Sequence, residues 1–281
     1  MRKRKTGLPI GKLFILLFVT IMLLIFSFPI FWSFLMSFKE RGDIFTLTPS
    51  FFPTVWSLEE YKNVLSMGGA ARFFLNSTLV AIGTTIISVF LATTCGYGLQ
   101  RMSGKSSERL SNAILMLRMV PVMVCQLPFY LLFRRFNLIN SLPALSLIYA
   151  ALSLPLAIWL SLGFYRNIPE SIYEAAMVDG CTEWQLFADI AFPLAKGSIV
   201  VVVLNVFFFA WNELSLSMVL INKEQYRTMA VGIRYFVSNT LETPYARMAA
   251  AGMVCIIPTI LITIFMQNYL IQGFVQGAVK G

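Results

Sequence analysis

The chain has 281 residues, of which 58% are apolar and only 12% are charged. This charged fraction is about half that of an ordinary soluble domain, which excludes a typical water-soluble globule. Lys and Arg outnumber Asp and Glu by 22 to 13, giving a net charge of +9, and the absence of histidine excludes a Ser-His-Asp hydrolase and histidine-ligated metal sites.

The N-terminus carries a basic cluster, Arg2 to Lys5, followed by an uncharged apolar run from Leu13 to Phe38. This run is too long for the core of a signal peptide and predicts an uncleaved membrane anchor. The positive-inside rule places the basic end in the cytoplasm. We expect residues 1–12 to form a cytoplasmic N-terminus and residues 13–281 to form a single transmembrane domain.

Apolar runs long enough to cross a bilayer, about 20 residues or more, recur along the chain. They are too long for barrel strands and lack a period of two, so we expect helices. Two of the runs each contain one charge, Arg118 and Glu213. The predicted fold is an all-α integral membrane protein with six transmembrane helices, spanning about 13–36, 74–99, 111–133, 142–164, 198–221 and 249–272.

Six spans place both termini in the cytoplasm, with cytoplasmic loops near 100–109 and 165–197 and external loops near 39–72, 134–141 and 222–247. Within the first external loop, Ser57-x-x-Glu60 has capping-box spacing and predicts a short helix through Tyr61 to Leu65. Asn76 or Ser77 is expected to cap the second span. Four prolines lie inside predicted spans and allow bends there: Pro121, Pro128, Pro155 and Pro258.

Gly104-Lys105-Ser106 looks like the end of a phosphate-binding P-loop, but the required first glycine is replaced by Leu99 and no strand precedes it. We expect no nucleotide site in this chain. The four cysteines form no CxxC pair, so no metal or redox site is predicted either.

The cytoplasmic loop 165–197 contains signals for two short helices. Pro169-Glu170 suits a first helical turn, and Asp179-Gly180 breaks that helix. Thr182-x-x-Gln185 then starts a second helix with a capping box, and its apolar residues are Trp184, Phe187 and Ile190, until Pro193 ends it. The loop forms either a docking knob for a partner or a pair of helices packed on its own protein, and composition leaves both open.

The motif in this loop is Glu174-Ala175-Ala176, three residues, Gly180, nine residues, and Ile190-Ala191-Phe192-Pro193. It resembles the EAA loop of permease subunits in binding-protein-dependent ABC importers. The spacing matches at every step, and the one departure is Phe192 where the pattern has leucine.

Further segments resemble the carbohydrate-importer branch, in particular the six-span subunit of the maltose-type permease pair: Phe74 to Ser77, Leu127 to Tyr130, Asn137 to Ser141, Trp211 to Glu213, Thr228 to Gly232 and Gly277 to Gly281. The resemblance implies a type I ABC importer permease in the plasma (inner) membrane, a transport subunit rather than an enzyme. Its implied partners are a second homologous permease, two cytoplasmic ATPases that hold ATP and Mg, and an extracytoplasmic solute-binding protein that delivers sugar. No nucleic-acid partner is implied.

The resemblance also assigns roles to residues of this chain. It places coupling to the ATPases on Glu174, Ala175, Ala176, Asp179, Gly180, Ile190 and Pro193. It places contact with the binding protein on the external loop Lys223 to Arg247, where the candidates are Arg227, Gly232 and Arg234.

Polar residues within the fifth span form a separate pattern. Ser198, Asn205 and Asn212 recur every seven residues, with Ser215 one turn further. Such a stripe either lines a translocation path or makes contacts between helices. Arg118 and Glu213 are costly to bury, are functional candidates, and have opposite charges that allow a pair.

Two other function classes make different demands on the sequence. A secondary transporter or channel predicts intramembrane ion-binding carboxylates and inverted repeats, and neither is visible. An intramembrane enzyme lacks histidine and an obvious acid pair within the spans. The sequence therefore favours the importer permease.

Overall fold

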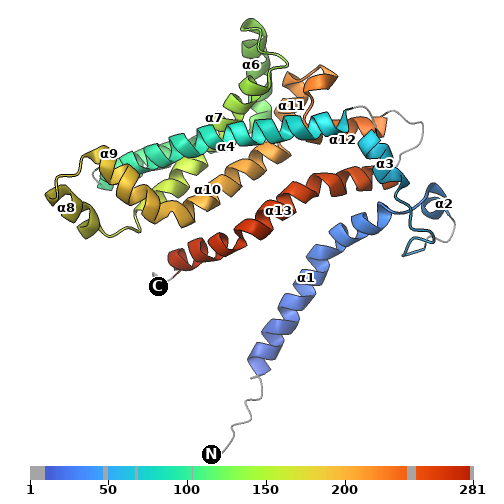
Figure 1. Cartoon of the computed structure of the whole chain (residues 1–281), viewed down its shortest axis with the longest axis horizontal. Coiled ribbons are helices and arrows are strands. Elements are labelled where there is room, and N and C mark those ends of the chain that lie inside the picture. The colour runs from blue at the N-terminus through green and yellow to red at the C-terminus, as the bar shows by residue number, and fades with distance from the viewer. Residues whose placement is uncertain (1–9, 47–49, 67–68, 103, 239–244, 279–281) are drawn as a thin grey trace, which may run out of the picture. The chain divides into compact units, whose positions relative to one another are not determined.

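Figure 1 shows the computed structural model of the chain, which describes residues 10–46, 50–66, 69–102, 104–238 and 245–278. These residues form helices joined by turns, and none of them lies in a strand. The chain divides into two compact units, Met1–Met67 with Phe236–Val254, and Gly68–Tyr235 with Cys255–Gly281.

The described residues contain five continuous helices long and apolar enough to cross a membrane, and a sixth span if one bent helix pair is counted. This agrees with the predicted number of six. The continuous spans are α1 (Ile10–Met36), α4 (Ala70–Arg101), α7 (Leu142–Tyr165), the helix Glu183–Asn212, and α13 (Tyr245–Ala278).

The third span, predicted over residues 111–133 with a bend allowed at Pro121, is broken there into two helices. It consists of α5 (Gly104–Met116), the short turn η1 (Leu117–Met119) and α6 (Val122–Arg135), with an angle of 84° across the break. The cause is Pro121, because the residue before a proline avoids helical backbone, and Val120 is extended with ψ 117°. The break leaves Arg118 exposed in the turn η1.

The predicted extent of the loop 100–109 is also wrong. The helix α4 continues to Arg101 and α5 begins at Gly104, so only two residues connect them. Gly104-Lys105-Ser106 therefore forms the first turn of a helix that follows another helix.

The core of the second unit is formed by three long helices, α4, α7 and α10 (Phe192–Asn212), which lie side by side in Figure 1. Small residues bring α4 and α7 into close contact, and a Cβ on Gly96 would lie 2.7 Å from the Cβ of Ser161. The hydroxyls of Ser88 and Ser153 are 2.9 Å apart across the same interface. Close backbone approach and interhelical hydrogen bonds are what hold helices together in lipid, where the hydrophobic effect gives no preference.

Asn76 and Ser77 do not cap the second span. The helix α4 begins at Ala70, with Gly69 before it, so both residues lie inside the helix and are buried. The predicted short helix in the first external loop is confirmed as α3 (Glu59–Ser66), and the Ser57 hydroxyl accepts a hydrogen bond from the Glu59 N–H at 3.2 Å.

The first unit also contains α2 (Arg41–Ile44), and polar contacts join α3 to the end of α1 and to the first turn of α13. The Ser37 and Tyr61 hydroxyls are 2.8 Å apart, and the Arg247 guanidinium is 2.7 Å from the Glu60 carboxylate. Between α2 and α3, the side chain and backbone of Thr54 donate hydrogen bonds to the Asp43 carboxylate and lower its pKa. These contacts order the segment that follows the N-terminal span.

Candidate functional site

The first helix of the 165–197 loop is α8 (Glu170–Val178), and it ends at the predicted break. Gly180 has φ +85°, its N–H donates to the Met177 carbonyl at 3.1 Å, and the Cys181 N–H donates to the Ala176 carbonyl at 3.0 Å. These two bonds form a Schellman motif, which places the residue after the cap in left-handed backbone. The glycine of the EAA motif is thus explained by the geometry of the helix end.

The capping box predicted at Thr182 and Gln185 is confirmed. The Thr182 N–H donates to the Gln185 amide oxygen at 2.8 Å, and the Gln185 N–H donates to the Thr182 hydroxyl at 3.4 Å. The helix that starts here consists of α9 (Glu183–Gln185) and a π-helical segment, η2 (Leu186–Ala191).

Pro193 does not end this second helix, contrary to the prediction. It lies in the first turn of α10, where a missing N–H costs little, and the preceding backbone has the wider π-helical turn. Helical backbone therefore runs without interruption from Glu183 to Asn212, and the second loop helix is continuous with the fifth span.

One face of the loop packs on its own protein. Tyr173, Ala176, Leu186 and Phe187 are buried in a cluster that includes Tyr97 from α4, as well as Tyr165 and Ala191. Ala176 is only 7% exposed, so it serves internal packing rather than a docking surface. Burial raises the pKa of Tyr173 to about 12, and the negative charge of Glu170 adds to the shift.

The other face of the loop is exposed at one end of the second unit, where α8 and α9 extend beyond α4 and α10 in Figure 1. Val178 is 87% exposed and Trp184 is 64% exposed. We call this exposed face the coupling surface; it consists of Ile172, Glu174, Ala175, Met177, Val178, Asp179 and Trp184. The structure thus shows that one face of the loop packs on its own protein and that the other face is exposed.

Sequence reasoning missed Arg101, the last residue of α4. Its guanidinium lies 3.1 Å from the Glu183 carboxylate and 3.2 Å from the Glu170 carboxylate. The Tyr97 hydroxyl donates to the same Glu183 carboxylate at 2.9 Å. The signal was a cation at the end of one span and two acidic residues in the 165–197 loop, but their separation along the chain hid the contact.

Glu213 terminates α10 and does not pair with Arg118 in the part of the chain that the structure describes. Its carboxylate accepts a hydrogen bond from the Tyr149 hydroxyl at 2.5 Å and from the Leu216 N–H at 3.0 Å. It thus satisfies backbone donors at the start of α11 (Ser215–Leu220). Arg118 takes no part in these contacts and lies in the exposed turn at the break of the third span.

The polar stripe predicted on the fifth span is interrupted. The helix ends at Asn212, so Ser215 belongs to α11 and is not one turn further along the same face. Ser198 is buried, whereas the exposed Asn212 donates to the Phe208 carbonyl of its own helix at 2.8 Å. Asn205 is half-buried, and its Oδ1 has no hydrogen-bond partner among the described residues.

Hydrogen bonds fix the segment after α11 to the start of α4, at the end of the second unit opposite the coupling surface. The Asn76 amide donates to the Gln225 and Arg227 carbonyls at 3.0 and 2.9 Å, and the Met229 N–H donates to the Ser77 hydroxyl at 2.8 Å. Asn140, from the loop before α7, accepts from the N–H groups of Asn222 and Lys223, both at 2.7 Å. The two loops predicted on the same side of the membrane therefore meet.

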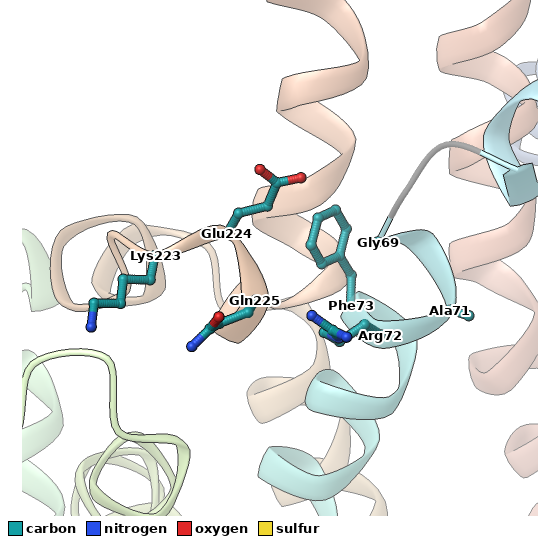
Figure 2. A pocket seen from close by; sticks show the side chains of 7 residues that line it. All are labelled: Gly69, Ala71, Arg72, Phe73, Lys223, Glu224 and Gln225. Atoms are coloured by element: carbon teal, nitrogen blue, oxygen red, sulfur yellow. The ribbon is translucent and has the colours of Figure 1, made fainter.

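Of the residues predicted to contact a binding protein, only Arg234 is exposed in α12 (Met229–Ser238). Gly232 is buried against the Phe73 ring, where a Cβ would come within 2.3 Å of Cδ2, so it is not a surface residue. A cavity of about 710 Å³ lies nearby, between the start of α4 and the turn η3 (Glu224–Tyr226). Figure 2 shows the residues that line it: Gly69, Ala71, Arg72, Phe73, Lys223, Glu224 and Gln225.

Asn76→Ala is expected to release the turn at Gln225 to Arg227, because it removes the donor to both carbonyls. We expect amide hydrogen exchange at residues 225–229 to become about tenfold faster, since each lost hydrogen bond is worth ~1 kcal/mol. Thr78→Ala is the matched control, because its hydroxyl bonds only to the Phe74 carbonyl of the same helix. Equal exchange in the two variants would contradict the anchoring role.

Comparison with known proteins finds a family model and relatives that are membrane components of transport systems. Residues 85–276 match the family described as "Binding-protein-dependent transport system inner membrane component". The diacetylchitobiose uptake system permease protein DasC of Streptomyces coelicolor and the trehalose transport system permease protein SugB of Mycobacterium tuberculosis are each 30% identical over 254 residues, covering 90% of this chain and 92% of each relative. The maltodextrin transport system permease protein MdxG of Bacillus subtilis is 25% identical, covering 98% of this chain and 99% of that protein.

The fold is also similar to a solved structure. A chain from the crystal structure of a bacterial ABC transporter involved in the import of the acidic polysaccharide alginate superimposes with a TM-score of 0.78. The two chains are 20% identical, and the match covers 92% of this chain and 96% of the other.

Proposed function

The chain belongs to the family of inner membrane components of binding-protein-dependent transport systems, and we propose that it forms, with a second homologous permease, the path by which a carbohydrate crosses the membrane. It is a permease subunit of an ABC importer, a transport component rather than an enzyme. The relatives named for diacetylchitobiose, trehalose and maltodextrin support a saccharide as substrate.

The intramembrane charges fit a neutral substrate driven by an external energy source. Glu213 is hydrogen-bonded to Tyr149 and to backbone N–H groups, so it serves the helix end rather than an ion. A chain of carboxylates that relays protons would require several such groups. Energy therefore enters from partner ATPases, which hold ATP and Mg.

The coupling surface is the proposed docking site for one of these ATPases. Its exposed apolar residues, Val178 and Trp184, lie in a loop between spans, where an apolar patch marks a protein contact. The buried residues on the opposite face of the loop pack α8 and α9 against the spans. Force applied at the coupling surface therefore reaches the membrane-spanning helices. This two-faced arrangement is the observation that carries the proposal.

The orientation follows from the basic N-terminus. With that cluster in the cytoplasm, both termini and the 165–197 loop are cytoplasmic, and the turns near Asn140 and Lys223 are external. The cavity in Figure 2 then faces the extracytoplasmic side and is the proposed contact for the solute-binding protein.

The continuity of the helix from Glu183 to Asn212 suggests how the energy is used. ATP binding draws the docked loops of the two permeases together, and the fifth span moves with its loop because no flexible joint separates them. The path between the permeases then changes from inward-facing to outward-facing.

Val178→Asp tests the docking site. A charge at this exposed apolar position is expected to reduce the amount of ATPase that co-purifies with the chain by about tenfold, because it leaves a desolvated charge in the interface. Uptake of saccharide into proteoliposomes is expected to fall in parallel.

Ser106→Asp is the matched control, since it adds the same charge to an exposed site in the first turn of α5, outside the coupling surface. Full ATPase retention by both variants would refute docking through this surface. Ala176→Trp is unsuitable for this purpose, because Ala176 is buried and the change disrupts the loop itself.

A further inference from the structure

We propose that Arg101 is a positioning residue that holds both helices of the coupling loop on the end of α4 and passes their movement to that span. This inference rests on the proposed function for the meaning of that movement, but the contacts themselves lie within this chain.

The contacts of Arg101 reach both loop helices at once. Its Nη1 is 3.2 Å from Glu170 at the start of α8, and its Nη2 and Nε are 3.1 and 3.3 Å from the two carboxylate oxygens of Glu183 at the start of α9. The bond to Glu183 is bidentate, a geometry that only the planar guanidinium of arginine provides.

Two further contacts add to this arrangement. The guanidinium carbon of Arg101 lies 5.4 Å from the centre of the Tyr173 ring, and Nη2 is 3.4 Å from the sulfur of Met177. Tyr97, one helical turn earlier on α4, donates to the same Glu183 carboxylate. The side chain of Arg101 is only 21% exposed, whereas the two carboxylates are 57% and 61% exposed.

The Arg101 contacts connect α8 and α9 to α4, whereas the chain itself connects α8 to α7 and α9 to α10. The second loop helix is continuous with α10, whereas α8 is bounded by the turn after Tyr165 and by the break at Gly180. Neither loop helix is next to α4 along the chain. The Arg101 contacts add a polar connection between α4 and the loop to the packing of Tyr97 on Tyr173 and Phe187. The other end of α4 holds the external turn through Asn76.

The individual ion pairs at such a surface contribute little to stability, so the expected consequence is loss of coordination rather than unfolding. Arg101→Gln keeps the size and polarity of the side chain but loses the charge and the fork. We expect normal accumulation and ATPase retention, with saccharide transported per ATP hydrolysed lowered at least about fivefold. Arg101→Lys keeps the charge without the bidentate geometry, so its ratio of saccharide transported to ATP hydrolysed is expected to lie between those of the wild type and Arg101→Gln.

The matched control is Arg166→Gln. Arg166 follows the end of α7, is exposed, and donates to the Ser107 hydroxyl of α5 at 3.1 Å. Within the residues that the structure describes, it makes no hydrogen bond or ion pair with α8 or α9. A double variant, Arg101→Gln with Glu183→Gln, is expected to be no worse than the single variant, because one interaction is removed in both.

A second measurement reports on the loop without any partner activity. Cys181 packs partly against the buried tyrosine cluster, so loosening of the loop exposes its thiol. With Cys95, Cys125 and Cys255 replaced by serine, we expect Arg101→Gln to increase the rate of maleimide labelling at Cys181 about fivefold in membranes containing the complete importer. Arg166→Gln is expected to leave that rate unchanged.

The outcomes separate the two proposals. An unchanged labelling rate, or faster labelling with an unchanged ratio of transport to hydrolysis, overturns the role of Arg101. If Val178→Asp retains its ATPases while Arg101→Gln still accelerates labelling, the docking proposal fails and the contact between α4 and the loop stands.

Discussion

Gly96→Val is expected to abolish accumulation of the folded chain in the membrane. A Cβ at this position would lie 2.7 Å from the Cβ of Ser161 and 2.9 Å from the backbone nitrogen of Leu162. The obstacle is the backbone of α7, which cannot rotate away as a long side chain does. Overpacking of this kind costs about 3 kcal/mol or more, and it separates two helices that hold the second unit together.

The measurement is the yield of monodisperse protein extracted from membranes. Gly98→Val serves as the control, because it lies on the same helix, is exposed, and a Cβ there has no atom within 4 Å. We expect the control to accumulate like the wild type. Equal yields of the two variants would show that α4 and α7 do not require this close approach.

Gly180→Val is expected to reduce saccharide uptake at least about tenfold. The backbone of Gly180 has φ +85°, and left-handed backbone costs an L-residue ~1–2 kcal/mol, with a larger cost for a β-branched side chain. No atom lies within 4 Å of the added Cβ, so the effect comes from the backbone rather than from a clash. Loss of the Schellman turn misplaces α9 relative to α8 and disrupts the coupling surface.

Asparagine provides a test of this explanation. Asn137 and Asn140 already adopt φ 56° and 65° in this chain, so Gly180→Asn is expected to retain most of the uptake. Gly197→Val, in helical backbone with open space around it, is the control for adding valine near the loop. If Asn and Val at position 180 impaired uptake equally, the glycine would serve a contact with the partner and not the turn.

The failures of sequence-based prediction have a common physical origin. Pro193 was expected to end a helix and Asn76 was expected to cap one, yet Pro193 lies in a first turn and Asn76 holds a distant turn. Both residue types have strong local preferences. Proline is nevertheless accommodated within a continuous helix where a π-helical turn precedes it, and asparagine lies inside a helix where carbonyls of another segment accept its hydrogen bonds. Local patterns do not specify which of these neighbours is present.

The amino-acid sequence alone was sufficient for the features that depend on local chemistry. Long uncharged runs predict membrane helices, Asp179-Gly180 predicts the break between two loop helices, and the Thr182 and Gln185 pair predicts a capping box. Each of these features depends on residues within a few turns. Only the tertiary structure placed Arg101 between Glu170 and Glu183, buried Ala176 and Gly232, and joined Glu213 to Tyr149. Those contacts join residues that are tens of positions apart or depend on which face of a helix meets a neighbour, and periodicity within one segment carries no information on either.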